Sequence, residues 1–74
     1  MKVKYDKELD ILYVSFSDEA VFESDEDKKG LILDYSAKGN IVGLEILNAS
    51  KKAGNPLKVE YEIAWTSFLQ SNKN

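Results

Sequence analysis

The chain contains no cysteine, no histidine and no arginine, and it has a single proline. Without cysteine and histidine it has no thiolate or imidazole zinc site, no disulfide, and no Ser–His or Cys–His dyad for nucleophilic catalysis. Without arginine it lacks the bidentate guanidinium contacts that favour phosphate and guanine. No apolar run approaches the about 18 residues of a membrane span, and the first residues lack the apolar stretch of a signal peptide. We therefore expect a cytoplasmic protein without a cofactor, which binds neither nucleic acid nor membrane.

What remains is a short, acidic chain. It has 74 residues, of which 43% are hydrophobic, and a formal net charge of −3. This composition is typical of one folded domain, here 1–74. A single core below about 70–80 residues rarely supplies more than about 3–5 kcal/mol of stability, and neither disulfides nor His/Cys metal sites can reinforce this one. We therefore expect a homodimer.

Alternating apolar residues and β-branched residues predict a mainly β fold, or a small α+β fold. We expect an antiparallel sheet of four to five strands with one or two short helical turns. The strongest feature is the hairpin 31–46, in which two apolar runs flank a short loop that contains glycine. The other predicted elements are strands at 3–5, 11–16 and 20–23, a charged turn at 25–30, and a helical turn at 47–52 closed by Gly54.

The segment after Gly54 fits two patterns. Its apolar residues at 57, 59, 61, 63 and 65 alternate as in a strand, whereas those at 57, 61, 64, 65 and 68 share one face of a helix. Valine, tyrosine and isoleucine favour a strand that runs into a short helical end at 65–69. We therefore assign 56–69 to a C-terminal strand or helix, and 70–74 to a frayed tail.

The strand pattern predicts two faces of the sheet. The first is expected to form the core, and its members are Leu12, Val14, Phe16, Leu31, Leu33, Val42, Leu44 and Ile46. The second is too apolar to be left in water, because it carries Ile11, Tyr13, Ile32 and Ile41. We expect the C-terminal segment and a second copy to cover this second face. The homodimer is expected to form there or by edge pairing of the C-terminal strand.

Three spaced patterns resemble one family of short bacterial proteins. They are Y-D-x-E-x-D-x-L-Y at 5–13, G-x-x-L-D-Y at 30–35 and G-x-E-I-L-x-A-S at 43–50. The family is the domain of unknown function numbered twenty-two eighty-three, and the resemblance covers a core of 2–52. It implies a small β-rich fold without an established activity, and a gene paired with a small toxin-like partner. Asn48 departs from the family pattern, which often has aspartate there, and the segment after Gly54 lies outside it.

Two groups of carboxylates are candidate sites. Asp34 interrupts an apolar strand and Glu45 lies in the facing strand, so the two could form a general acid/base pair. Amphipathic alternation also explains Asp34, and protection of a sheet edge explains Glu45. In the turn after the first strand, Asp6, Glu8 and Asp10 could bind a divalent cation. We favour the interpretation that Asp6 or Asp10 caps turn amides while Glu8 remains in water.

A third group of carboxylates lies in one short acidic stretch. It is a candidate docking site for a basic partner, and its members are Asp18, Glu19, Glu23, Asp25, Glu26 and Asp27. A solvated loop is the simpler interpretation of the same residues. We expect a non-enzymatic protein–protein interaction module that neutralises a basic, toxin-like partner. The alternative is a small carboxylate-dependent, metal-assisted hydrolase, and the absence of histidine and cysteine favours the interaction module.

Overall fold

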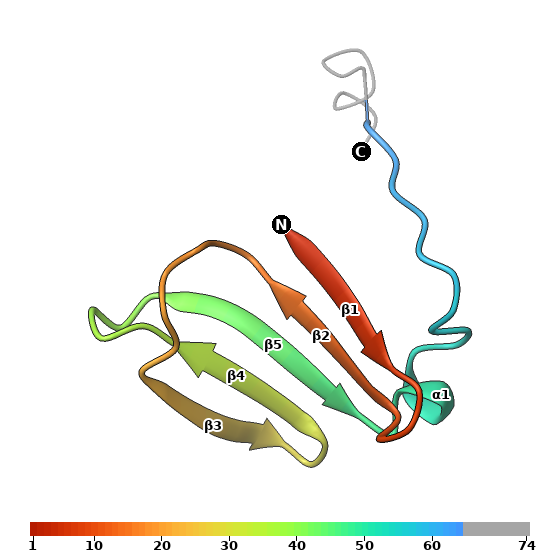
Figure 1. The fold of residues 1–74 in the computed structure, drawn as a ribbon, viewed down its shortest axis with the longest axis horizontal. Helices are drawn as coiled ribbons and strands as arrows, with labels where there is room; N and C mark the ends of the chain where they lie inside the picture. The colour runs from red at the N-terminus through yellow and green to blue at the C-terminus, as the bar shows by residue number, and fades with distance from the viewer. Residues whose placement is uncertain (65–74) are drawn as a thin grey trace, which may run out of the picture.

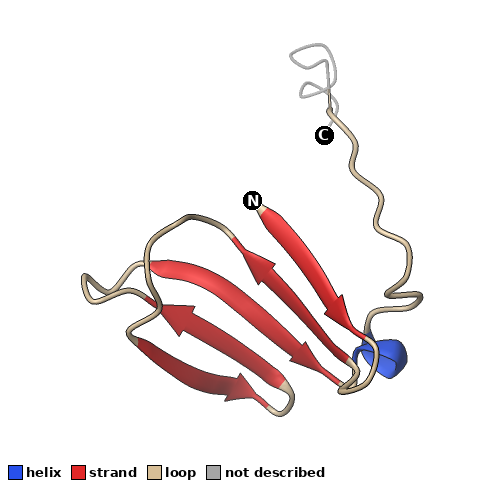
Figure 2. Cartoon of the chain, in the orientation of Figure 1, coloured by secondary structure: helices blue, strands red, loops and turns tan. Residues whose placement is uncertain are grey.

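The computed structural model describes residues 1–64 as one antiparallel sheet followed by a short helix (Figure 1, Figure 2). The order across the sheet is β1-β2-β5-β4-β3, and all neighbouring strands are antiparallel. The predicted fold class, mainly β with an antiparallel sheet and a short helical turn, is confirmed. The elements are β1 (Lys2–Asp6), β2 (Ile11–Ser15), β3 (Glu23–Lys28), β4 (Leu31–Tyr35), β5 (Ile41–Leu47) and α1 (Ala49–Lys52).

The hairpin between β4 and β5 forms where the sequence predicts it. Its loop is closed by the Ser36 carbonyl, which accepts a hydrogen bond from the Gly39 N–H at 2.9 Å. Gly39 has a φ of 87°, which glycine adopts without a steric penalty. On its other side β5 pairs with β2, so it is the central strand of the five.

The acidic stretch forms an edge strand rather than a turn. The predicted strand at 20–23 and the predicted turn at 25–30 are both wrong, because β3 begins at Glu23 and continues to Lys28. All residues of β3 are exposed, and charged side chains are common on edge strands, where they oppose pairing with other chains. Pairing with β4 outweighs the weak strand propensity of aspartate and glutamate.

The chain beyond α1 is irregular. Residues 57–64 are neither strand nor helix, so the C-terminal strand predicted here is absent. The predicted helical end at 65–69 and the tail at 70–74 lie outside the described residues. A strand requires a neighbour for its backbone hydrogen bonds, and Figure 1 shows this segment leaving the sheet after α1. α1 itself confirms the helical turn predicted within 47–52.

Cross-strand pairing determines which side chains share a face of the sheet. The face predicted as the core is confirmed for Leu12 and Val14 in β2, Leu31 and Leu33 in β4, and Leu44 and Ile46 in β5, and β1 extends it. Val42 lies at the register shift between β4 and β5, outside these cross-strand pairs, and it is buried. We call this the apolar face, and its members are Val3, Tyr5, Leu12, Val14, Leu31, Leu33, Leu44 and Ile46. We call the opposite side the polar face, and it carries Lys2, Lys4, Ile11, Tyr13, Ser15, Ile32, Asp34 and Glu45.

Few apolar side chains are buried in the described part of the chain. Val42 and Ala49 are buried, whereas no member of the apolar face is. Figure 1 shows the reason, since the sheet is a single layer and α1 lies at one end of it. A sheet needs a second layer to close a core. Among residues 1–64, no helix has the length and apolar character that a membrane crossing requires.

Candidate functional site

The apolar face extends across four of the five strands. At its centre Leu44 pairs with Val14 on one side and with Leu33 on the other. Neighbours within the sheet leave these side chains half-buried, and no second layer covers them among residues 1–64. Val3 and Tyr5 are absent from the predicted core face but belong to this one, and their alternation with lysines was the available signal. An apolar sheet face of this extent is a candidate protein-interaction surface.

The polar face is less apolar than the sequence predicts. Ile11, Tyr13 and Ile32 do lie there, but charged residues of β1 and β5 lie beside them. The placement of Ile41 on this face is wrong, because a register shift pairs it with Tyr35, which alternates with Leu33 of the apolar face. The Nζ of Lys4 lies over the Tyr13 ring, 5.0 Å from its centroid. Such a contact suits an aromatic side chain that remains in water. The need for a protein cover is therefore greater on the apolar face than on this one.

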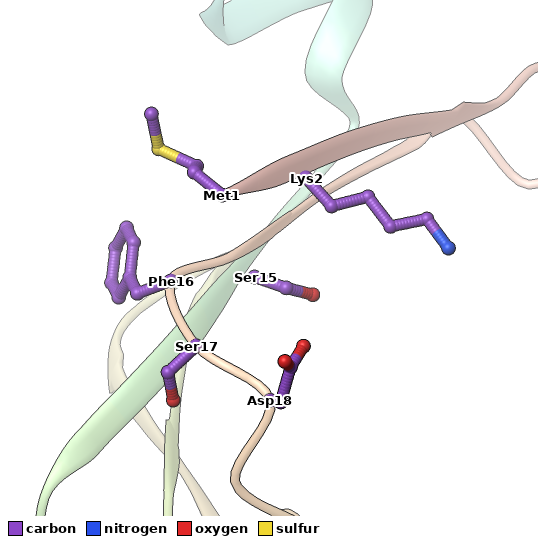
Figure 3. Close-up of a pocket in the computed structure, with 6 residues that line it drawn as sticks. All are labelled: Met1, Lys2, Ser15, Phe16, Ser17 and Asp18. Atoms are coloured by element: carbon purple, nitrogen blue, oxygen red, sulfur yellow. The ribbon is translucent and has the colours of Figure 1, made fainter.

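Figure 3 shows the hollow where β1 begins and β2 ends. Met1 and Phe16 point to one side, whereas Lys2, Ser15 and Asp18 point to the other. Because alternate strand residues share a face, Phe16 lies on the side of Val14, and it is 42% exposed. The hollow therefore lies at the end of the sheet, where the apolar and polar faces meet. Met1 and Phe16 extend the apolar face to this end.

The structure brings together the carboxylates of Asp34 and Glu45 on the polar face. Asp34 is only 7% exposed, and its Oδ1 accepts a 2.7 Å hydrogen bond from the Ser24 hydroxyl. Gly43 lies opposite Asp34, and a Cβ at this glycine would lie 3.4 Å from Asp34 Oδ2. Glu45 lies in the central strand, so its interpretation as protection of a sheet edge is wrong.

Glu45 holds its proton more tightly than an ordinary glutamate does. Burial raises the pKa of Glu45, and the hydrogen bond with Asp34 and the negative charge of Asp34 raise this pKa further. A carboxyl that keeps its proton can donate it, which is what a general acid does. Within residues 1–64, no three side chains of the metal-ligating types His, Cys, Asp and Glu come together. Glu45 therefore has the raised pKa of a general acid, and it lies beside the buried carboxylate of Asp34.

Replacing Glu45 with glutamine is expected to stabilise the protein at neutral pH. The glutamine amide can donate a hydrogen bond to Asp34 without a second negative charge, as protonated Glu45 does. Because the folded state raises the pKa of Glu45, the stability from its protonated form is complete below the ordinary glutamate pKa. It is lost as the pH rises through the folded value. Thermal unfolding from acidic to neutral pH should show a higher Tm for Glu45→Gln at neutral pH and no gain in acid.

The control for this prediction is Glu8→Gln in the exposed β1–β2 turn. It removes the same charge without a neighbouring carboxylate contact, so its Tm should follow that of the parent at every pH. Equal Tm values for Glu45→Gln and the parent at neutral pH would show that the carboxylate pair imposes no strain on the fold.

The aspartates of the β1–β2 turn have structural roles, and the capping interpretation is confirmed. Asp6 Oδ1 accepts a hydrogen bond from the Leu9 N–H at 3.0 Å. Asp10 accepts hydrogen bonds from the Tyr5 hydroxyl at 2.6 Å and from the Ser50 hydroxyl and N–H at 2.7 and 3.0 Å. These hydrogen bonds lower the pKa of Asp10, and the bond from Tyr5 has the largest effect. The ionised Asp10 thus attaches α1 to the turn, and its stabilising effect is lost as the pH falls through the lowered value.

The six acidic residues of the predicted docking site do not form one surface. The first two lie in the loop between β2 and β3, and the others lie in β3. Within β3, Glu23 and Asp25 lie on the side of the apolar face, whereas Glu26 lies on the polar side. Glu26 Oε2 also accepts a 2.8 Å hydrogen bond from the Gly30 N–H, so its position has a structural reason. All six are exposed, as a docking role requires.

These features define a small single-sheet domain with one open apolar face. The profile of a family described as "Protein of unknown function (DUF2283)" matches residues 2–50, which is more than half of the chain. The protein belongs to this family, as the three spaced sequence patterns predict. No curated protein and no solved structure matches the chain. The family match ends within α1, so the segment that follows α1 lies beyond it.

Proposed function

We propose that the protein is a non-enzymatic protein–protein interaction module that forms a homodimer through its apolar face. The observation that carries this proposal is the apolar face, which extends over four strands without a covering layer among residues 1–64. Removing apolar surface from water stabilises by about 25 cal/mol per Å². Two such sheets that pack face to face give each other the second layer that a core requires.

The charges around the apolar face support a two-fold dimer whose interface is centred on the middle strands of the sheet and not on β3. Glu23 and Asp25 lie on the same side of the sheet at its β3 edge, where a facing copy would bring like charges together. Leu44 in the central strand and its partners Val14 and Leu33 carry no charge. A two-fold interface is self-complementary, so the same central patch of each copy would lie against the other.

The oligomeric state and one pair of variants test this proposal. Light scattering at micromolar concentration should give twice the chain mass, and the Tm should rise with protein concentration. Leu33→Asp introduces a charge on the apolar face and should yield monomers at concentrations where the parent is dimeric. Ser15→Asp introduces the same charge on the polar face, opposite Lys2, and should leave the dimer intact.

Circular dichroism identifies which of these variants remain folded, so that loss of the dimer is not confused with unfolding. A parent protein that stays at the mass of one chain over the whole concentration range contradicts the proposal. A folded Leu33→Asp protein that dimerises as tightly as the parent contradicts the assignment of the interface to the apolar face.

A basic protein is the heterologous partner that we propose for this module. The exposed acidic residues of β3 support it, and Glu23, Asp25 and Asp27 are the expected contacts. Exposed charges of this kind steer association over a Debye length of about 8 Å at physiological salt and act mainly on its rate. The carboxylate-dependent hydrolase is the second candidate function, and it is supported by the contact of Asp34 with Glu45 and the raised pKa of Glu45.

A further inference from the structure

The outer edge of β1 is open. In the described sheet β1 pairs only with β2, so the backbone groups on its other side can accept another strand. Val3 and Tyr5 lie on the apolar face, and the charged residues of β1 lie on the polar face. Val3 is 41% exposed, so the apolar face is unfinished at this edge.

The segment 57–63 has the sequence of a strand without the pairing of one. Its apolar side chains, which are 61–80% exposed, are Leu57, Val59, Tyr61 and Ile63, and they alternate with Lys58, Glu60 and Glu62. Lys58 Nζ and Glu60 Oε2 lie 3.6 Å apart, so these two charges lie on the same side of the chain, as they do in a strand. Within the described residues, the backbone of 59–63 makes no hydrogen bond to another backbone group. Figure 1 shows this segment as a drawn-out irregular trace, and its backbone is available for pairing.

One antiparallel register matches this segment to β1 at every charged position. It also places apolar residues beside apolar residues, so that the apolar face gains a further strand. The pairs would be Lys2 with Glu62, Val3 with Tyr61, Lys4 with Glu60, Tyr5 with Val59, and Asp6 with Lys58. Opposite charges in directly facing positions stabilise a sheet, and like charges destabilise it. A shift of two residues keeps the faces but sets Lys4 against Lys58 in one direction and Asp6 against Glu60 in the other.

The other open edge, β3, does not match the segment. Glu23 and Asp25 lie on the apolar side of the sheet, where the apolar side chains of the segment would have to lie. On the polar side Glu26 would lie near the glutamates of the segment. Charge and polarity therefore both select the β1 edge.

From this match we infer that the segment 57–63 of one copy docks as an additional strand on the β1 edge of a second copy. The inference rests on the proposed dimer and specifies how its two copies are joined. In the described sheet the segment does not pair with its own β1. A turn at Asn55 precedes it, in which the Asn55 carbonyl accepts a hydrogen bond from the Lys58 N–H and Asn55 Oδ1 accepts one from the Leu57 N–H, both at 3.0 Å. Figure 1 shows the chain leaving the sheet from this turn. In a two-fold dimer each copy gives one strand and receives one.

Charge reversal on each side of the proposed pairing tests the inference in the full-length chain. The first variant is Lys2→Glu/Lys4→Glu, and the second is Glu60→Lys/Glu62→Lys. In a homodimer of either variant, residues 2 and 4 carry the same charge as residues 62 and 60 that face them, in both strand pairs. The dimer Kd of each variant should therefore rise about tenfold or more at low salt. In an equimolar mixture, a heterodimer restores opposite charges in both strand pairs. Native mass spectrometry should therefore show a heterodimer as the main species, with the affinity of the parent dimer.

A control mixture separates strand pairing from the general attraction between chains of different net charge. It combines Lys28→Glu/Lys29→Glu with Asp18→Lys/Glu19→Lys, which change the net charge by the same amounts at exposed residues away from β1 and 57–63. This mixture should give a statistical distribution of dimers. A preference for the heterodimer in the control equal to that in the test mixture would overturn the inference.

The remaining outcomes distinguish the inference from the proposed function. If the test variants form homodimers as tightly as the parent, the strand exchange is wrong while the dimer stands. If each variant is destabilised, mixing restores nothing, and one chain with all four substitutions is restored, the segment pairs with its own β1 and not with a second copy. A monomeric parent overturns the proposed function and the exchange together.

Discussion

Gly43→Ala is expected to destabilise the protein by about 2–3 kcal/mol, which approaches the whole stability of a small single core. A Cβ at Gly43 would lie 2.7 Å from the Val14 carbonyl oxygen, a backbone atom that can move only if β2 moves. Alanine normally suits a strand better than glycine by about 0.5–1 kcal/mol, so steric contact reverses the usual sign. Urea denaturation of parent and variant measures the difference in the free energy of unfolding.

Gly39→Ala is the comparison for this prediction. Gly39 has a positive φ but no atom within 4 Å of a new Cβ, so alanine there should cost about 1 kcal/mol through backbone conformation alone. If Gly43→Ala is as stable as the parent, β2 and β5 are further apart than the structure places them.

Leu44→Ala is expected to destabilise the protein by about 2–5 kcal/mol, the range for truncation of packed leucines. Leu44 lies between Val14 and Leu33 at the centre of the apolar face, so its loss opens a gap in the middle of the sheet. Urea denaturation at one fixed protein concentration measures the effect, because dimer formation would also contribute to stability.

Leu9→Ala removes the same atoms at a position that is 62% exposed in the β1–β2 turn. Its unfolding free energy should stay within about 0.5 kcal/mol of the parent value. A Leu44→Ala protein that is as stable as Leu9→Ala would show that the apolar face contributes nothing to the fold, and the interface assigned to it would lose its basis.

The parts of the fold that follow from local sequence were predictable. Alternation identified β1, β2, β4 and β5, and Gly39 in a short polar loop identified the hairpin. The two faces followed from the same alternation, which correctly separated Asp34 from Leu33. A glycine inside a strand indicates a close approach of backbone, which was the available signal for Gly43.

The parts that depend on partners were not predictable from the sequence. The sequence offers edge protection as one explanation of Glu45, because the order of strands along the chain does not reveal which strand becomes central in the sheet. The acidic residues of β3 have weak strand propensity, and β3 is stabilised as a strand by its pairing with β4. The segment 57–64 has strong strand periodicity and no strand neighbour among the described residues. Periodicity indicates which side of a strand is apolar, but the pairing depends on what lies beside it.

The central place of β5 has a consequence for the order in which the sheet forms. β1 pairs with β2, β3 pairs with β4, and β4 pairs with β5. In each of these pairs the two strands are neighbours in sequence, so the unit β1–β2 and the unit β3–β4–β5 each close only short loops. Among the strand pairs of the described sheet, only that between β2 and β5 joins residues far apart in the sequence, as in the pair Ile11↔Leu47. Loop-closure entropy grows with the length of the loop, and contacts between distant residues slow folding. We therefore expect the two local units to begin forming before they join, and the joining of β2 with β5 beside Gly43 to limit the rate at which the whole sheet forms.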